Sequence, residues 1–599
     1  MYLAFLSPVV IAFLIAYLYP VLRTVQMSFF EVSDISAARD TWEFVGLYNY
    51  VDLFSRQLFR VSFKNMMLIF LAGGAAVFLI SLFFAWVLHK GMFMGNLWRN
   101  LIYLPTVITP VAMITVWTQY AYNSRYGLLK TVFEALGLDG LAAIPWTSTQ
   151  YAFWSMLIAF CFCSIGGNLL VYMAAMKKIP DDLFEAAFMD GATEGKIFFR
   201  ITLPLIADNV KTQFTFWTIG CIGFFLWSRV FSVVPSDPTT ITPASYMYDQ
   251  IFGTSISSNA VASGTNVGMG AAIGVVLCLI TVAAMALINL IFPKEKDVRR
   301  TAPMQKYPSF CLRQKSPPAG RVSGWAGKAV HVLGKALILC WCAFTVALIG
   351  WVVLASFTPT RDIFQNDLLA AGLDLSGYEV VMERYHIMDY FLNSVLYTVC
   401  ACAGLIVFCA PAAFVMTKFV FRGRRLFQTL FSVALGLPGV MILAPLYMML
   451  VRANLHNFRG TLILVYLCTG IAATTVYLMG FFATVPMTVF ESGLIDGCSH
   501  ITSFYRLILP LAKPGIVTIT IFNFIGYWNE YIWALVFSGK QANRTLAVAL
   551  QTLVTSMQTT GNYQGLFAGV VIVFVPTVII YVLLSKQIMS GATAGAVKG

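Results

Sequence analysis

Charged residues are scarce in this chain. Only 11% of its 599 residues are Asp, Glu, Lys or Arg, whereas 59% are hydrophobic. A soluble domain carries about a quarter charged residues, so the composition excludes a soluble globular protein and places most of the chain in lipid. Because lipid offers the backbone no hydrogen-bond partners, we expect helical spans of about 20 apolar residues each.

The sequence also lacks the motifs of metal and redox sites. It has twelve cysteines but no C-x-x-C, and most of them lie inside apolar segments, as Cys161 and Cys163 do. The five histidines are scattered. This pattern is typical of buried thiols and argues against a zinc site or a disulfide framework, so we predict no metal.

No phosphate-binding loop of the form G-x-x-x-x-G-K-[ST] is present. The nearest stretch, Gly195-Lys196, has Asp190 where the first glycine is needed. The chain is therefore not expected to be an enzyme or to bind a nucleotide itself, and energy for any active process must come from a partner.

The apolar segments fall into two sets of six. They lie at about 2–23, 65–88, 100–121, 152–176, 210–233 and 268–292, and at about 331–356, 390–417, 427–450, 460–482, 514–538 and 566–587. We predict an all-α polytopic membrane protein of about 12 transmembrane helices, with halves at 1–292 and 329–599. Residues 293–328 between them are polar, basic and proline-containing, which is typical of a flexible linker.

The basic linker sets the orientation, because loops rich in Lys and Arg stay in the cytoplasm. Both termini are then cytoplasmic, and the net charge of +13 reflects topology rather than nucleic-acid binding. Residues 1–22 form the first span and not a cleavable signal peptide, since no basic segment precedes them. Arg23 at the outer end of that span departs from the rule, which leaves open whether a cytoplasmic leader precedes Met1.

One motif is present twice, within 180–206 and within 486–514. Each copy contains a Glu, an Asp five residues later, the following Gly, and a Leu-Pro pair that ends the motif. Every one of these residues in the second copy lies 306 positions after its counterpart in the first. A register this constant indicates an internal duplication.

The first copy resembles the EAA loop of bacterial ABC importer permeases, in Glu185-Ala186-Ala187, in Gly191 and in Ile201-Thr202-Leu203-Pro204. That resemblance implies two cytoplasmic loops that dock two ATPase subunits, which bind ATP and Mg. It also implies an extracytoplasmic solute-binding protein and a place in the bacterial cytoplasmic (inner) membrane. The docking residues it implies are Glu185, Ala186, Ala187, Asp190, Gly191, Glu491, Asp496 and Gly497.

Further stretches resemble sugar-importer permeases of the MalF and MalG type. Phe44-Val45-Gly46-Leu47-Tyr48-Asn49-Tyr50 is similar to a segment after the first span of MalF-type chains, and the tail from Gly591 to Gly599 is similar to that of MalG-type chains. The chain therefore looks like a fused MalF/MalG-type permease of the type I importer fold, for a sugar or oligosaccharide.

Two alternatives stay open. One is an ABC permease for another solute, such as iron, thiamine or a polyamine; fusion of the two halves is more familiar in iron and thiamine importers. The other is a 12-helix secondary transporter of the major facilitator type, to which the basic stretch Phe421-Arg422-Gly423-Arg424-Arg425 has a faint likeness.

The second EAA copy departs from the pattern, with Ser492-Gly493 in place of two alanines. Because glycine in a helix costs about 1 kcal/mol relative to alanine, we expect the second docking helix to be looser.

Polar and aromatic residues inside the spans are candidates for the substrate path, because buried polar groups are costly there and aromatic rings suit sugar faces. The candidates are Asn168, Phe225, Trp227, Asn523, Tyr527, Trp528, Asn529 and Glu530. Asn65 and Asn393, by contrast, are predicted to bridge helices.

Overall fold

The fold is almost entirely helical, as predicted. A computed structural model describes residues 2–37, 39–232, 237–253, 265–292, 325–456 and 458–595. Within these ranges the only sheet pairs β1 (Phe30–Glu31) with β2 (Glu43–Phe44) in antiparallel register. Most of the predicted linker, including Cys311, lies outside the described residues, as do the last four residues of the tail.

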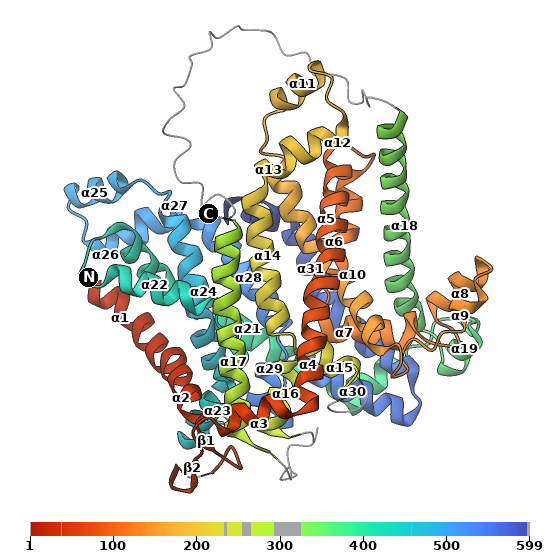
Figure 1. Cartoon of the computed structure of the whole chain (residues 1–599), viewed down its shortest axis with the longest axis horizontal. Helices are drawn as coiled ribbons and strands as arrows, with labels where there is room; N and C mark the ends of the chain where they lie inside the picture. Colours follow the sequence, from red (N-terminus) through yellow and green to blue (C-terminus); the bar gives the residue numbers. More distant parts are fainter. Residues whose placement is uncertain are drawn as a thin grey trace.

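The helices of each half follow the order in Figure 1. Those before the linker are α1 (Tyr2–Phe13), α2 (Tyr19–Met27), α3 (Tyr48–Ser55), α4 (Gln57–Leu68), α5 (Gly74–His89), α6 (Gly95–Val107), α7 (Pro110–Val116), α8 (Leu128–Ala135), α9 (Asp139–Ala142), α10 (Ala152–Met176), α11 (Asp181–Met189), α12 (Glu194–Ile197), α13 (Leu203–Leu205), α14 (Ala207–Ile222), α15 (Leu226–Phe231), α16 (Pro243–Phe252) and α17 (Val267–Ile291). Those after it are α18 (Trp325–Ala355), α19 (Thr360–Gln365), α20 (Ser376–Glu379), α21 (Ile387–Lys418), α22 (Arg424–Ala434), α23 (Leu443–Arg452), α24 (Thr461–Phe482), α25 (Met487–Ile495), α26 (His500–Ser503), α27 (Leu509–Leu511), α28 (Lys513–Trp528), α29 (Ile532–Phe537), α30 (Leu546–Thr560) and α31 (Tyr563–Gly595).

Eight helices among the described residues are long and apolar enough to cross a membrane, and three further spans are bent pairs. The predicted third spans are not straight: α6 meets α7 at 99°, and α22 meets the helix that begins at Gly439 at 101°. The fifth spans also differ from the prediction, because α14 ends after 16 residues and α28 is bent by 74° from the segment before it.

Proline explains the sharp bends of the third spans. Pro110 begins α7, and Pro438 immediately precedes the short turn that leads into α23. Proline donates no backbone hydrogen bond and holds the residue before it in an extended conformation, so a helix ends ahead of it. The two prolines lie 328 positions apart, as Asn65 and Asn393 do. The helix break at the proline therefore occupies equivalent positions in the two halves.

The first span of the chain packs against the other half. In Figure 1 the red helices α1 and α2 lie beside the teal helices α22 to α24. The Tyr17 hydroxyl donates to the carbonyl of Ala434 at 2.6 Å, and the Thr24 hydroxyl donates to that of Met441 at 2.8 Å. The ring of Phe13 meets that of Phe431 edge-on at 4.6 Å.

The first span of the second half likewise packs against the first half. Helix α18 lies beside the helices of the first half (Figure 1), where Trp341 stacks on Phe162 at 4.4 Å and Trp351 stacks on Tyr120 at 3.7 Å. The sequence division at residues 292 and 329 therefore differs from the packing, because each half completes its core with the other half's first span.

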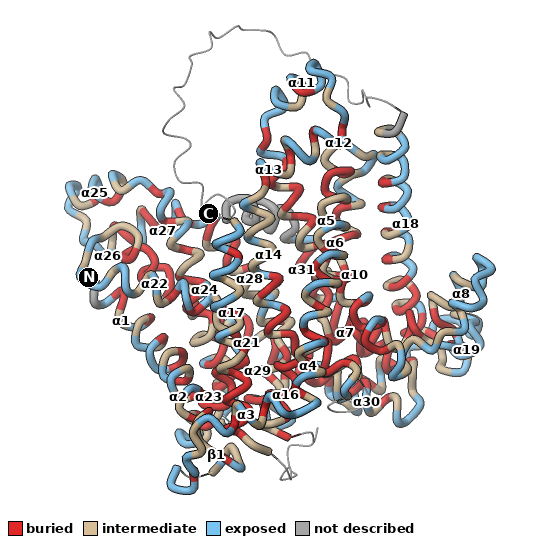
Figure 2. Tube along the Cα trace, in the orientation of Figure 1, coloured by how far each residue is buried: buried red, intermediate tan, exposed pale blue. Residues whose placement is uncertain are grey.

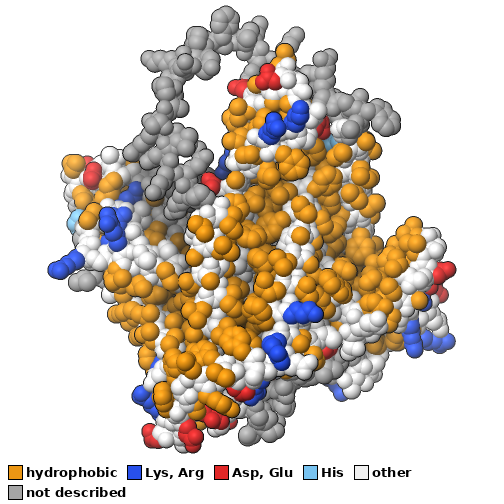
Figure 3. All heavy atoms as spheres, viewed as in Figure 1, with side chains coloured by type: hydrophobic (Ala, Val, Ile, Leu, Met, Phe, Trp, Pro, Cys, Tyr) orange, Lys and Arg blue, Asp and Glu red, His pale blue; other side chains and the backbone are white. Residues whose placement is uncertain are grey.

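A broad apolar region lies between two more polar ends on the face shown in Figure 3. Figure 3 shows hydrophobic side chains over the middle of this face, with Lys, Arg, Asp and Glu gathered toward the top and bottom. Figure 2 shows buried residues where the helices meet and exposed residues along the outer sides of α1 and α18. This pattern fits a membrane around the apolar region.

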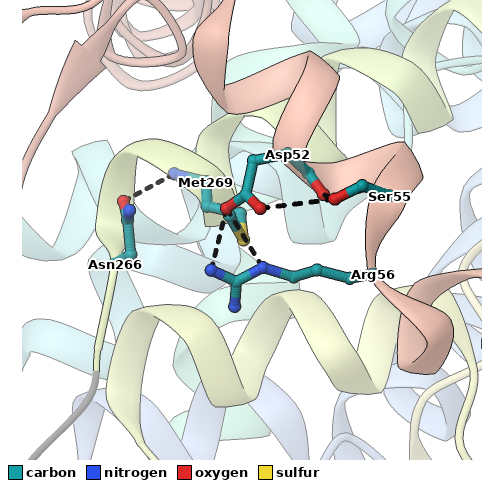
Figure 4. Close-up of polar contacts among 5 residues, drawn as sticks. All are labelled: Asp52, Ser55, Arg56, Asn266 and Met269. Carbon is teal, nitrogen blue, oxygen red and sulfur yellow. Dashed lines mark hydrogen bonds and ion pairs between the residues drawn. The ribbon is translucent and has the colours of Figure 1, made fainter.

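Two short polar contacts lie at the end of the molecule that carries α3. The Arg56 guanidinium pairs with Asp52 at 2.8 Å one helical turn away, and the Asn266 side chain caps α17 by accepting from the Met269 amide (Figure 4). The exposed ion pair contributes little to stability, so the cap and the apolar packing hold this end.

We expect the two halves to stay together when the chain between them is cut, because each first span is packed against the other half. A protease site inserted within 293–324 and cleaved after purification should leave both fragments in one peak on gel filtration in mild detergent. Separation of the fragments in that detergent would contradict this packing.

Candidate functional site

The two copies of the repeated motif fold alike at the same end of the molecule. Helices α11 and α25 have nine residues each, and both of their bounds differ by 306 positions. They lie at the upper end in Figure 1, opposite α3 and the β1–β2 pair. Each helix begins directly after a proline in extended conformation, Pro180 or Pro486, which fixes where it starts.

Both helices end at a glycine whose backbone has a positive φ. Gly191 and Gly497 have φ of +71° and +84°, a left-handed conformation that costs other residues about 1–2 kcal/mol. The amides of Ala192 and Cys498 donate back to Ala187 and Gly493, both at 2.9 Å, which completes a Schellman turn in each copy. The two glycines are therefore needed by the turn itself.

The predicted docking residues share one arrangement in both copies. Glu185, Asp190, Glu491 and Asp496 are exposed, and none of the ion pairs among the described residues uses them. Ala186 is exposed and Ala187 is buried beneath it. The carboxylates are thus free to bind groups of another protein.

Sequence reasoning missed the most exposed apolar residues of this surface. Met189 is 87% exposed and Ile495 is 85% exposed, and they occupy the same position in the two copies. Both belong to the motif helices at the upper end in Figure 1. The signal was present in the sequence, because an apolar residue precedes the Asp in each copy.

The helices are held to the membrane domain in different ways. In the first half Lys90 forms a 2.7 Å ion pair with Glu194 and lies over the ring of Trp86 at 3.9 Å. Burial lowers the pKa of Lys90, and the hydrogen bond with Glu194 opposes that shift. Its counterpart Lys418, 328 positions later, instead donates to the carbonyl of Val485 at 2.6 Å.

Gly493 has a packing role in the second helix, while the expectation that this helix is looser than the first stays a prediction. Gly493 is buried, and a Cβ there would overlap the side chain of Leu507, so glycine permits close packing. Phe490 in the same helix is only 1% exposed and is stacked on His500 at 5.9 Å. Tertiary packing offsets the low helix propensity of glycine here.

The first-half candidates for the substrate path meet in one cavity. Asn168, Phe225 and Trp227 line a cavity of about 400 Å³ between α7, α10, α14 and α15. The other residues that line it are Pro110, Phe160, Ser164, Gln213, Phe216, Trp217, Gly220, Cys221, Gly223, Phe224 and Leu226. None of these residues is charged.

The second-half candidates are occupied by contacts within the chain. Asn523 donates to the Thr474 hydroxyl at 3.0 Å, Asn529 donates to the Val107 carbonyl at 3.4 Å, and Trp528 packs between Phe391 and Phe524. Tyr527 donates to the carbonyl of Tyr466 at 2.9 Å.

Glu530 has a structural role in the described chain. Its carboxylate accepts from the backbone amides of Trp533 and Ala534 at 2.8 and 2.9 Å and from the Tyr466 hydroxyl at 3.1 Å. It thereby caps α29, which begins inside the membrane domain where water is scarce.

The two bridging asparagines are confirmed. Asn65 donates to the carbonyl of Ile241 at 2.9 Å, just before α16, and Asn393 donates to that of Ala542 at 2.7 Å, ahead of α30. Both side chains hold a non-helical stretch of backbone, at equivalent places in the two halves.

One known protein family matches two regions of this chain. The family described as "Binding-protein-dependent transport system inner membrane component" matches residues 77–297 and 404–589, which together are more than half of the chain. The chain belongs to this family. It is an ABC importer permease with two copies of the family's domain, so the duplication inferred from the repeated motif is confirmed.

Relatives of this permease each match about half of it. The diacetylchitobiose uptake system permease protein NgcG of Streptomyces coelicolor is 29% identical over 276 residues, which cover 46% of this chain and 91% of the relative. DasC, a permease protein for the same sugar in the same organism, is 33% identical over 253 residues, covering 42% of this chain and 90% of the relative. A solved bacterial ABC transporter for alginate import is 22% identical, with a TM-score of 0.40, and the match covers 44% of this chain and 98% of that one.

Replacing Gly493 with Val should disorder α25 more than replacing Gly497 with Ala. The valine would have to displace Leu507, at a cost of about 1–3 kcal/mol, whereas Gly497 has open space around it and only its positive φ opposes alanine. Hydrogen–deuterium exchange of peptides covering 487–498 measures the difference. Gly480→Ala, in the helix interior of α24 with no neighbour within 4 Å, is the matched control. Equal exchange in both variants would contradict the close packing.

Proposed function

We propose that this permease imports a neutral sugar or oligosaccharide, driven by two ATPase subunits that dock on α11 and α25. The observation that carries the proposal is the pair of identical helix-and-turn segments at one polar end, each with free carboxylates and one projecting apolar residue. A duplicated surface of this kind suits two copies of one partner. The chain has no phosphate-binding loop, so ATP and Mg belong to that partner.

The path from this surface to the cavity is short. The first motif continues through α12 and α13 directly into α14, which supplies Trp217, Gly220 and Cys221 to the cavity wall. The Lys90–Glu194 ion pair ties the same segment to the end of α5. A movement of α11 caused by closure of the ATPases would therefore reach the cavity through one continuous stretch of chain.

The chemistry of the cavity supports a carbohydrate. Aromatic rings at Phe160, Trp217, Phe225 and Trp227 offer apolar faces for stacking, and Asn168 offers an amide for hydroxyl groups. A thiamine, polyamine or metal cation would need a carboxylate to offset its lost hydration, and no described lining residue supplies one. The named substrates of NgcG and DasC point the same way.

The polar ends support the membrane topology that we propose. With α11 and α25 in the cytoplasm of a bacterial cell, both termini are cytoplasmic, and α3, α16 and α30 face outward to an extracytoplasmic solute-binding protein. The basic residues of the linker fall on the cytoplasmic side in this orientation, as the positive-inside rule requires.

Reconstitution tests the function. In liposomes with its ATPase and binding protein, the permease should take up labelled diacetylchitobiose only with ATP, and the chain alone should hydrolyse none. Asn168→Leu should lower uptake about tenfold, since one lost hydrogen bond in a buried site costs about 1–3 kcal/mol. Trp154→Ala, at an exposed residue of the same helix, is the control. Uptake by the chain alone in response to a proton or sodium gradient would refute the proposal in favour of a secondary transporter.

Docking is tested at the two projecting residues. Met189→Asp and Ile495→Asp should each reduce the ATPase recovered with the purified permease, and the double variant should abolish it, because each removes an apolar contact. If these are ordinary surface positions, each change shifts stability by at most about 0.5 kcal/mol and leaves ATPase recovery unaltered. Leu138→Asp, an exposed apolar residue near the opposite end, is the matched control.

A further inference from the structure

The cavity of the first half has an equivalent place in the second half. Helices α10 and α14 correspond to α24 and α28, with each residue of the second pair 306 positions after its counterpart. Ser164 and Cys221, which line the cavity, therefore correspond to Gly470 and Tyr527. Asn523 donates to Thr474, and their counterparts Trp217 and Asn168 both line the first-half cavity.

The ring of Tyr527 fills the equivalent place. It stacks on Tyr466 with centroids 4.6 Å apart and planes 16° apart, and its hydroxyl donates to the Tyr466 carbonyl at 2.9 Å. A Cβ built at Gly470 would overlap the Tyr527 hydroxyl. Tyrosine at 527 thus requires glycine at 470, whereas the smaller Cys221 leaves room for both Ser164 and the cavity.

Polar side chains stand at second-half positions that correspond to the lining of the first-half cavity. Thr474 and Asn523, the counterparts of Asn168 and Trp217, bind each other, and Glu530, the counterpart of Phe224, accepts from the Tyr466 hydroxyl. The Asn529 side-chain oxygen is buried and has no hydrogen-bond partner among the described residues. A buried acceptor without a partner is costly, and a hydroxyl group beside it would satisfy it.

We propose that the second half contains a second carbohydrate cavity, which Tyr527 closes. The proposal rests on the proposed function for the identity of the ligand, but not for the existence of the cavity. The chain then carries one solute in its first half, and the ring of Tyr527 prevents a second from binding. Tyr527 is the residue that makes two halves of one origin unequal in substrate binding.

Thiol labelling tests whether the ring closes a cavity. In two chains that each keep a single cysteine, the thiol introduced by Tyr527→Cys should react with a small methanethiosulfonate about tenfold faster than Cys409, the fully buried thiol of α21. Labelling as slow as that of Cys409 would overturn the proposal.

A stability comparison serves where the labelling variant folds poorly. Gly470→Ser, which introduces the first-half residue, should lower the melting temperature in the presence of Tyr527 and not in the Tyr527→Cys background. A Gly470→Ser change that is harmless beside Tyr527 would overturn the idea that the ring fills this space. Neither measurement uses a sugar.

Sugar protection then tests the ligand. Diacetylchitobiose should slow labelling at position 527 in the Tyr527→Cys variant, and saccharide binding to the purified chain should rise from one site to two. Tyr527→Phe keeps the ring and should keep one site. Labelling that the sugar does not slow would refute a carbohydrate cavity, provided that the wild-type chain transports this sugar. If the wild type transports none, the proposed function fails, and the labelling rate still decides whether the cavity exists.

Discussion

Every interruption of a helix inside the membrane domain must have its backbone groups satisfied by the chain itself, since lipid supplies no partners. The permease interrupts its helices repeatedly, and at several of these breaks a side chain satisfies the backbone groups. Asn65 and Asn393 hold the carbonyls ahead of α16 and α30, and Glu530 caps α29. Thr24 and Tyr17 satisfy carbonyls next to the break between α22 and α23. The cavity lies beside such breaks, since Pro110 at the start of α7 and the stretch between α14 and α15 both line it.

The duplication explains which features are shared and which differ. Positions that satisfy backbone groups or terminate helices agree in both halves, as Pro110 and Pro438 or Gly191 and Gly497 do. Positions that only fill space have diverged, as Cys221 and Tyr527 have, because a change of volume is tolerated when a neighbour such as Gly470 changes with it. Divergence at space-filling positions let one half keep a cavity while the other became a packed wall.

Much of the fold could be predicted from the sequence, because hydrophobic length and the repeated motif are local signals. The span 152–176 agrees with α10 at both ends. The bends at Pro110 and Pro438 were visible as prolines, but their angle depends on what the next helix packs against. The packing of α1 and α18 against the opposite half could not be predicted, because the sequence of an apolar helix does not indicate which half it contacts. The contacts of Glu530 left no signal for a similar reason: its partners include backbone amides, which the sequence does not display.

The packing of the first span against the other half has a consequence for how the chain is made. The first span is synthesised well before its partners, because Phe431 and Ala434, on which it packs, come more than 400 residues later in the chain. At about 5–20 residues per second, α1 waits on the order of tens of seconds beside lipid before its partner exists. Its polar groups must find temporary partners during that interval, in lipid headgroups or in the insertion machinery. Fusing both halves into one chain guarantees that the awaited partner is made by the same ribosome, at the same place in the membrane.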